Sequence, residues 1–492
     1  MKGRNAKNNR GLLRFPWHVI SLAAFPAIFL YANNMDSLVA AHAVAPLVIS
    51  LAGAGVLWIL ARQILRDSLR AGLAVSFFIL LFFSYGRVYS ALEDRGWFLP
   101  GQAVCLSATL LLWISGIYYL GRTKRDFRNV TAILNIAAAA LVLSSLVRIS
   151  SSHVGRRKRL SREPDSIAAA ESPPGTVPDS PPDIYFLVFD EYAHPETMKK
   201  YFAYDNSALF DELETAGFCP AKNSRTRTPS TRKILASILN MRDFTGEGKT
   251  ADELYQKITS DRVSKLFKRL GYSYVYFGNW FELARYRRAM IESADYYFNY
   301  YQISPASPFT EFQHVFWKTT MLRPFYYPLA GDGYINYHRQ GALETLSRLG
   351  EIPAEIEGPK YVFAHIIPPH APFVFGAHGE SIEPAEAKSD EFYPGQYIFV
   401  TGKIQELIGN LLSGSDSPPI IILQSDHGLR VGPNLSLADG EWEKILNAFY
   451  LPGQECSVIS DSISPVDTFR LIFNLYFGMD YELLGERAGP EE

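Results

Sequence analysis

Three apolar runs in the C-terminal half of the chain each lead to side chains that can bind a metal ion or move a proton. Asp190 directly follows the first run, His365 and His370 lie at the end of the second, and Asp426 and His427 close the third. One such residue alone is usually a turn residue or a hydrogen-bonded surface group, but three coinciding cases are typical of a functional site. Carboxylate and imidazole groups together suit a borderline divalent ion such as zinc or manganese, so the pattern indicates a metal centre.

The elements around these side chains predict an α/β domain with a doubly wound, mostly parallel sheet. Four runs read as buried strands, at residues 184–189, 273–277, 360–366 and 419–423. Helical periodicity lies between them, at residues 206–217, 251–270, 341–349 and 397–412. Strands alternating with helices indicate a parallel sheet covered on both faces, in which ligands bind beyond the carboxyl ends of the strands.

Four segments, in this order along the chain, resemble the alkaline-phosphatase/sulfatase superfamily, and in particular its membrane-anchored lipoteichoic acid synthases and phosphoethanolamine transferases. They are "PPDIYFLVFDEY" at 181–192, "TPSTRKILASILN" at 228–240, "PPHAPF" at 368–373 and "IIILQSDHG" at 420–428. In that superfamily the first segment ends in a metal-binding acid, and the last segment carries an Asp-His pair that binds the same metal. The second carries the nucleophile, and the third contacts the charged head of the substrate.

The resemblance implies that Asp190, Asp426 and His427 bind one divalent ion together with the nucleophile Thr231. Zinc or manganese suits these groups best, and magnesium or calcium remains an alternative. A Thr hydroxyl is a weak nucleophile, so a bound ion that lowers its pKa fits the expected chemistry. The structural alternative for Thr231 is a helix cap. Ser230 is the alternative nucleophile.

Two further side chains complete the expected catalytic set. Arg232, beside Thr231, is expected to clamp the transferred anion, and His370 to act on the substrate side. Glu191 is the alternative to Asp190 as metal ligand. His365 and His378 are the candidates for a second ion, although the lack of any His after His427 favours a single ion. Sulfatases mature a Cys or Ser in a C/S-x-P-x-R motif to formylglycine. Here Pro229 lies before Thr231 and no Cys is nearby, which argues against a formylglycine sulfatase.

The N-terminal part predicts an integral, multi-pass membrane domain. Five apolar runs of membrane-spanning length lie at residues 17–33, 43–61, 71–90, 103–121 and 129–147. Basic residues concentrate at the N-terminus, in the second loop and in the fourth loop, which places those parts in the cytoplasm and the C-terminal domain outside. A basic cluster at 156–162 disagrees with this orientation unless it contacts anionic lipid heads. Cys219 and Cys456 are candidates for a disulfide in an oxidising compartment.

The predicted organisation is a five-helix transmembrane domain at 1–149, a Ser/Pro/Arg-rich linker at 150–182 and a sulfatase-like catalytic domain at 183–492. The net charge of −2 offers no field for nucleic acid. We expect a transferase that moves a phosphoryl-linked head group, of the phosphoglycerol or phosphoethanolamine type, from a lipid donor to a glycan or lipid acceptor of the cell envelope. A phosphate or sulfate ester hydrolase and a non-catalytic envelope assembly protein are the alternatives.

Overall fold

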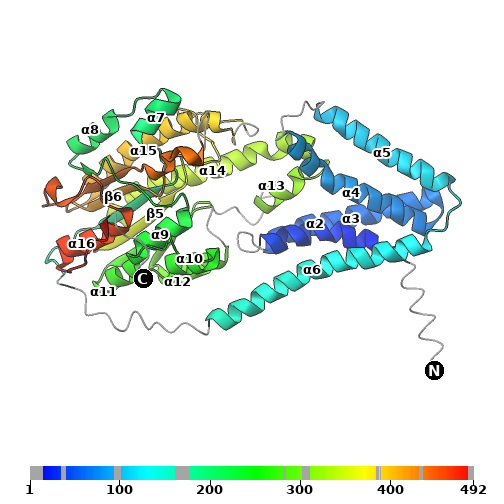
Figure 1. Cartoon of the computed structure of the whole chain (residues 1–492), viewed down its shortest axis with the longest axis horizontal. Helices are drawn as coiled ribbons and strands as arrows, with labels where there is room; N and C mark the ends of the chain where they lie inside the picture. The colour runs from blue at the N-terminus through cyan, green and yellow to red at the C-terminus, as the bar shows by residue number, and fades with distance from the viewer. Residues whose placement is uncertain are drawn as a thin grey trace. The chain divides into compact units, whose positions relative to one another are not determined.

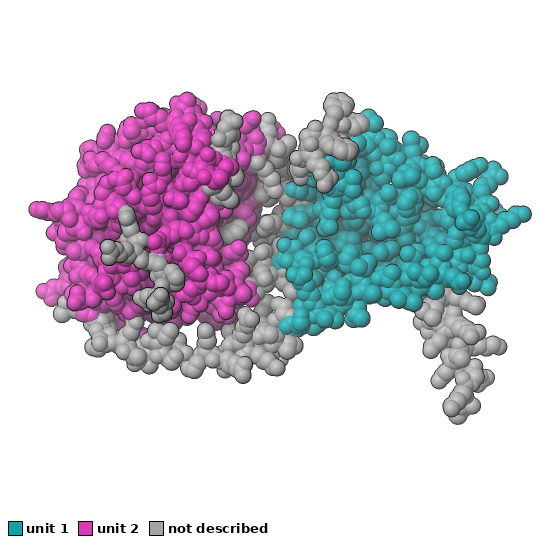
Figure 2. Space-filling model, viewed as in Figure 1, with its two compact units in different colours: residues 1–170, 305–331 teal, residues 171–304, 332–492 magenta. Residues whose placement is uncertain are grey.

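The computed structural model describes residues 15–34, 40–93, 101–160, 175, 177–280, 284–301, 311–383, 387, 389–430 and 436–485. The chain divides into two compact units, shown in separate colours in Figure 2. Unit 1 comprises residues 1–170 and 305–331, and unit 2 comprises residues 171–304 and 332–492. The domain boundaries expected from the sequence stay a prediction, and much of the expected linker lies outside the described residues.

Unit 1 consists of apolar helices (Figure 1). They are α2 (His18–Asn33), α3 (Ala40–Leu65), α4 (Ser68–Glu93), α5 (Gln102–Arg122), α6 (Arg128–Leu160) and the short α13 (Glu311–Lys318). Four of them, α3 to α6, contain a stretch long and apolar enough to cross a membrane. The remaining predicted span, which is the first in the sequence, is α2. It is apolar but has only 16 residues. At 1.5 Å per residue it extends about 24 Å, less than a hydrocarbon core of about 30 Å.

Residues 311–331 pack against the helices of unit 1 although they follow much of unit 2 in the sequence. Phe316 joins an apolar cluster with Ala27, and the Met321 N–H donates to the Phe82 carbonyl. The Arg323 guanidinium donates to the Gly86 carbonyl. From the sequence, this segment was expected to belong to the catalytic domain. Its membership of unit 1 depends on these contacts between residues far apart in the chain, which no local pattern reveals.

Unit 2 is built on a seven-stranded sheet in the order β2-β7-β6-β1-β5-β3-β4. The strands are β1 (Ile184–Phe189), β2 (Cys219–Pro220), β3 (Ser273–Phe277), β4 (Tyr296–Phe298), β5 (Lys360–Ile366), β6 (Ile420–Ser425) and β7 (Asn447–Tyr450). β1, β3, β4, β5 and β6 run parallel, whereas β7 pairs with β6 and β2 pairs with β7 in the antiparallel sense. The expected mixture of apolar N-terminal helices and a mostly parallel sheet is confirmed.

Helices lie against both faces of this sheet (Figure 1). The α-helices are α7 (Pro195–Phe202), α8 (Ala208–Thr215), α9 (Thr231–Asn240), α10 (Ala251–Thr259), α11 (Arg262–Arg269), α12 (Ala284–Ser293), α14 (Arg323–Glu355), α15 (Tyr393–Gly414) and α16 (Thr468–Phe477). The short 3-10 helices are η1 (Asp390–Phe392), η2 (Leu437–Asp439), η3 (Glu441–Glu443), η4 (Cys456–Val458) and η5 (Pro465–Asp467). Residues of α9, α10, α11 and α16 share one apolar core with alternate residues of β1, and residues of α8, α14 and α15 share a second core with the others. Burial of every β1 side chain explains why that strand is apolar throughout rather than alternating.

The helix expected over 251–270 is two helices in the structure. The side chain of Asp261 accepts the backbone N–H of Ser264 and thereby starts α11. An Asp in this place is a good N-cap, which ends the periodic run at residue 259. Cys219 and Cys456 form a disulfide with a Cα–Cα distance of 5.2 Å.

Candidate metal and phosphoryl-transfer site

The sheet order brings the predicted chemical groups to one edge. β1 lies between β5 and β6 and is parallel to both. Phe189 is in register with Ser425, so Asp190 and Asp426 leave neighbouring strands at the same level. His365 is in register with Val188 on the other side. Three segments far apart in the sequence therefore meet at the carboxyl ends of three adjacent strands.

Asp190, His365 and Asp426 form a candidate metal site. One ligand atom from each lies within 4.8 Å of the others, and all three residues are buried. His427 joins them, since its Nε2 lies 3.3 Å from Asp426 Oδ2 and 3.7 Å from Asp190 Oδ1. Asp190 Oδ1 and Asp426 Oδ2 are buried and make no hydrogen bond within the described part of the chain. Buried carboxylate oxygens without donors are costly unless a cation meets them, so the site fits a divalent ion.

The two carboxylates differ in their protonation equilibria. Burial alone would raise the pKa of Asp190, but the neighbouring imidazoles of His370, His365 and His427 outweigh it and hold the pKa below the usual range. Burial and the negative charge of Asp190 raise the pKa of Asp426. Two like charges this close oppose each other's ionisation, and a bound cation would remove that conflict.

The hydrogen bonds of the two imidazoles assign them different tautomers. His427 Nδ1 lies 2.9 Å from the Gly428 carbonyl oxygen, which can only accept a proton. The Nε2 lone pair of His427 therefore faces the carboxylates, as in a metal ligand whose other nitrogen donates to a backbone carbonyl. For His365 the reverse holds. Asn279 Nδ2 donates to the His365 carbonyl at 2.8 Å and lies 3.2 Å from His365 Nδ1, so neutral His365 carries its proton on Nε2, 3.4 Å from Asp190 Oδ2.

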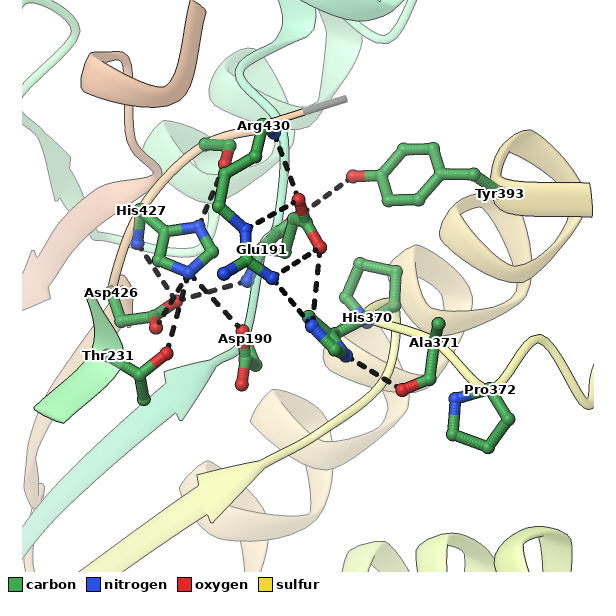
Figure 3. Close-up of polar contacts among 12 residues, drawn as sticks. Asp190, Glu191, Thr231, His370, Ala371, Pro372, Tyr393, Asp426, His427 and Arg430 are labelled. Carbon is green, nitrogen blue, oxygen red and sulfur yellow. Dashed lines mark hydrogen bonds and ion pairs between the residues drawn. The ribbon is translucent and has the colours of Figure 1, made fainter. Parts of the chain in front are cut away.

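Thr231 lies beside the candidate metal site of Asp190, His365, Asp426 and His427, which is called the metal cluster below. Its side chain does not cap its helix. It is the first residue of α9, and the N-cap position belongs to Ser230. Thr231 Oγ1 is 3.5 Å from His427 Nε2 (Figure 3). Of the two hydroxyls considered from the sequence, Thr231 is the one that the structure brings to the carboxylates.

A second polar cluster, formed by Glu191, His370 and Arg430, adjoins the first (Figure 3). The Arg430 backbone N–H and Nε donate to Glu191 Oε1 at 2.9 and 3.2 Å. Arg430 Nη2 lies 2.7 Å from His370 Nε2, which in turn is 3.6 Å from Glu191 Oε2. Burial lowers the pKa of His370, but the negative charges of Asp190 and Glu191 outweigh it and raise the pKa above its usual value.

Glu191 links the two clusters through its backbone. Its φ of 59° lies in the left-handed region, which costs a non-glycine residue roughly 1–3 kcal/mol. In this conformation its N–H donates to Asp426 Oδ1 while its side chain reaches Arg430. The turn after β1 thus orients one carboxylate of each cluster.

The remaining predicted residues lie at different places. Arg232 lines a hollow beside Thr231, with its guanidinium 5.6 Å from the centre of the Tyr255 ring. His378 is exposed and is not part of the cluster. Its backbone N–H donates to the Glu380 carboxylate. His365, considered from the sequence only for a second ion, shares the cluster of the first.

Arg430 and Asn279 were missed in the sequence. A cation two residues beyond the Asp-His-Gly turn was the available signal for Arg430. Asn279 follows β3 within two residues, and an amide directly beyond a predicted strand was the corresponding signal. Both act on the cluster through other side chains, which a search for metal ligands and nucleophiles does not select.

No protein-family model matches the sequence, and no curated protein matches it. Among solved structures, the C-terminal periplasmic domain of EptC from Escherichia coli, in complex with zinc, is similar at 13% identity and a TM-score of 0.44, over 65% of this chain and 92% of that one. The integral membrane lipooligosaccharide phosphoethanolamine transferase A of Neisseria meningitidis is similar at 14% identity and a TM-score of 0.41, over 95% of each chain. The protein named putative sulfatase yidJ from Bacteroides fragilis is similar at 14% identity and a TM-score of 0.37, over 62% of this chain and 74% of that one. At these low values the likenesses assign neither substrate nor activity to this chain.

Proposed function

We propose that this chain is a membrane-anchored, metal-dependent transferase that moves a phosphoryl-linked head group through a covalent intermediate on Thr231. The observation that supports this most directly is the position of the Thr231 hydroxyl, 3.5 Å from His427 Nε2 at a cluster of buried, unpaired carboxylate oxygens. A hydroxyl nucleophile needs such activation, whereas a purely structural Thr at a helix start does not.

Asp190, Asp426 and His427 are proposed as the residues that hold the ion, with Thr231 as the fourth ligand. His427 is preferred to His365 as the imidazole ligand because its Nε2 lone pair faces the carboxylates. A divalent ion there supplies Lewis-acid chemistry, which lowers the pKa of a hydroxyl and screens phosphoryl charge. His365 instead offers an Nε2–H towards the same point and is suited to donate a hydrogen bond to an anion.

In the proposed reaction Thr231 Oγ1 forms a bond to phosphorus while the bond from phosphorus to the donor's alcohol oxygen breaks. The proton that Thr231 loses is proposed to pass to solvent, and protonated His370 is proposed to give its proton to the leaving alcohol oxygen. The hydroxyl of the envelope acceptor then attacks phosphorus and gives its proton to His370, while the bond from phosphorus to Thr231 Oγ1 breaks and Thr231 takes a proton from solvent. The guanidinium groups of Arg430 and Arg232 are proposed to stabilise negative charge on the phosphoryl oxygens.

The proposed topology has five spans, with α2 as the first, a doubly wound catalytic domain at 183–492 and that domain outside the cytoplasm. The disulfide between Cys219 and Cys456 supports an oxidising compartment. A reporter enzyme fused after Glu492 tests this orientation, because cytoplasmic activity of the fusion would place the domain on the other side.

Mass spectrometry of the full-length protein tests the covalent step. After incubation with phosphatidylglycerol or phosphatidylethanolamine and rapid acid quenching, we expect a phosphoryl head-group adduct on the peptide that contains Thr231. The matched variants are Thr231→Ala and Ser230→Ala, of which only the first should abolish the adduct. Release of a free head group without any adduct would favour the hydrolase alternative with metal-bound water as nucleophile.

A further inference from the structure

An apolar hollow opens beside Thr231 and differs in character from the two charged clusters. The empty space in it, open solvent included, is about 520 Å³. Its walls come from α9, α10, α12, β3 and β5, and most of them are aromatic or aliphatic. Tyr255 and Tyr286 stack within it, with ring centres 4.7 Å apart, and Ile258 and Met290 add aliphatic surface.

The charges at this hollow select against a cationic ligand. Among the described residues that line it none is Asp or Glu, and the described cation, Arg232, lies over the Tyr255 ring. A cation such as ethanolamine needs a carboxylate or an open aromatic face. The Arg232 guanidinium already lies over the Tyr255 ring, and its positive charge repels a second cation that approaches this part of the hollow.

The remaining lining is polar and is formed by Thr231, Arg232, Thr259, Asn279 and His365. A ligand that contacts both kinds of lining carries an anionic phosphoryl group joined to an uncharged, apolar group. We propose that this hollow binds the apolar group of a phosphate ester whose phosphorus is presented to Thr231. The proposal rests on the proposed function and narrows it: the group held here is uncharged and apolar, not an ammonium head.

The hydrophobic effect sets the size of the expected preference. Burying a CH₂ group contributes enough to change affinity about fourfold, and burying an aromatic side chain about 10-fold to 100-fold. A phenyl group on the ligand should therefore be distinguishable from a methyl group in a direct binding measurement.

The test uses phosphonates, whose C–P bond is not cleaved by transfer between oxygens. Isothermal titration calorimetry would compare methylphosphonate, phenylphosphonate and 2-aminoethylphosphonate on the zinc-loaded, full-length protein in lipid nanodiscs, with empty nanodiscs as blank. We expect phenylphosphonate to bind at least about 10-fold tighter than methylphosphonate, and 2-aminoethylphosphonate to bind no tighter than methylphosphonate. Equal affinities for the phenyl and methyl compounds, or tightest binding of the aminoethyl compound, would overturn the proposal.

Matched variants separate the hollow from the general core. Ile258→Ala removes contact surface in the hollow and should lower the phenyl-to-methyl affinity ratio several-fold. Ile238→Ala removes the same atoms from the same apolar core outside the hollow and should leave the ratio unchanged. Because a ratio of affinities does not depend on the folded fraction, partial unfolding of either variant does not obscure the result. Arg232→Ala should weaken the binding of methylphosphonate and raise the affinity of 2-aminoethylphosphonate relative to that of methylphosphonate. An unchanged aminoethyl-to-methyl affinity ratio would count against the charge argument.

Failure of this inference and failure of the transfer reaction give different results. If Thr231 forms an adduct but the three phosphonates bind alike, the transferase stands and the hollow holds no substrate group. If phenylphosphonate is preferred but no adduct forms, the hollow binds an apolar phosphate ester and the covalent step is wrong. If no phosphonate binds, the hollow proposal is overturned whatever the adduct measurement gives.

Discussion

The two polar clusters at the edge of the sheet contain similar residue types, but their hydrogen bonding differs. In the metal cluster, Asp190 Oδ1 and Asp426 Oδ2 are buried without a donor among the described residues. In the second cluster, Glu191 receives two charged donors from Arg430, and His370 Nε2 is in contact with the same guanidinium. The first cluster is incomplete without a cation, whereas the second is already neutralised by its own arginine.

This difference indicates a division of labour. A cluster of unpaired carboxylates pays a large desolvation penalty, which only a bound cation offsets. A paired cluster keeps a guanidinium in place at low cost and presents its remaining donors to an arriving anion. We therefore expect substitutions in the first cluster to abolish the metal and the chemistry, and substitutions in the second to weaken the reaction while the metal stays bound.

The largest expected effect is that of Thr231→Ala. Turnover should fall by about 10⁴-fold or more, because a covalent nucleophile is seldom replaced by another group. Steady-state kinetics on head-group transfer would measure the loss, and circular dichroism with metal analysis would show that fold and ion are retained. Thr231→Ser is the matched control and should keep partial activity. A folded, metal-loaded Thr231→Ala protein with full activity would remove the main support for the transferase.

The next effect distinguishes the two clusters by their metal affinity. Asp426→Asn should weaken zinc binding by more than the roughly 10-fold to 100-fold typical of outer-sphere substitutions, since it removes a proposed ligand. Glu191→Gln should leave the affinity within about 10-fold, because the Glu191 side chain faces Arg430 and only its backbone contacts Asp426. Competition with a chelator, followed by elemental analysis, gives both constants. Equal losses in the two variants would contradict the division between the clusters.

A smaller effect is expected for the second cluster itself. Arg430→Ala should lower kcat/KM by on the order of 10²–10³-fold, comparable to the removal of one preorganised donor to transition-state charge. Arg430→Lys should recover little of this, because an ammonium cannot reproduce contacts with both Glu191 and His370. Zinc content should match that of the unaltered protein. If Arg430→Ala instead loses zinc, the guanidinium supports the metal cluster and not the substrate.

The proximity of Asp190, Asp426 and His427 was easier to predict from the sequence than that of Glu191, His370 and Arg430, for a physical reason. Asp190, Asp426 and His427 directly follow buried strands, and the convergence of parallel strands at one edge makes their proximity predictable. The strands at 273–277 and 360–366 have the predicted limits because Gly or Pro stands within two residues of each end of both runs.

Arg430 and Arg232 were not distinguishable from the sequence. Arg232 is adjacent to the proposed nucleophile, yet its side chain turns towards Tyr255, while Arg430 reaches Glu191 from another strand end. Which way a long side chain points depends on tertiary packing, and adjacency in the chain does not determine it. The same holds for residues 311–331, whose contacts with α2 to α4 connect segments more than two hundred positions apart.

The smallest expected effect concerns Asp261, a buried carboxyl outside both polar clusters, which serves as a reference for the candidate metal site. Burial raises its pKa to about 6, although the N–H and hydroxyl of Ser264 favour the charged form. A raised carboxyl pKa means that the folded state binds the proton more tightly than the unfolded state, so the contribution to stability is full below about pH 4 and is lost as pH rises through about 6. The shift corresponds to roughly 3 kcal/mol.

Asp261→Asn does not titrate, so the difference in free energy of unfolding between the variant and the unaltered protein should move in favour of the variant by up to that amount between pH 4 and pH 7. Denaturant unfolding of both proteins at several pH values measures it. A difference that stays constant with pH would show that burial alone does not raise a carboxyl pKa in this fold, and the raised pKa of Asp426 would then be due to the charge of Asp190 alone.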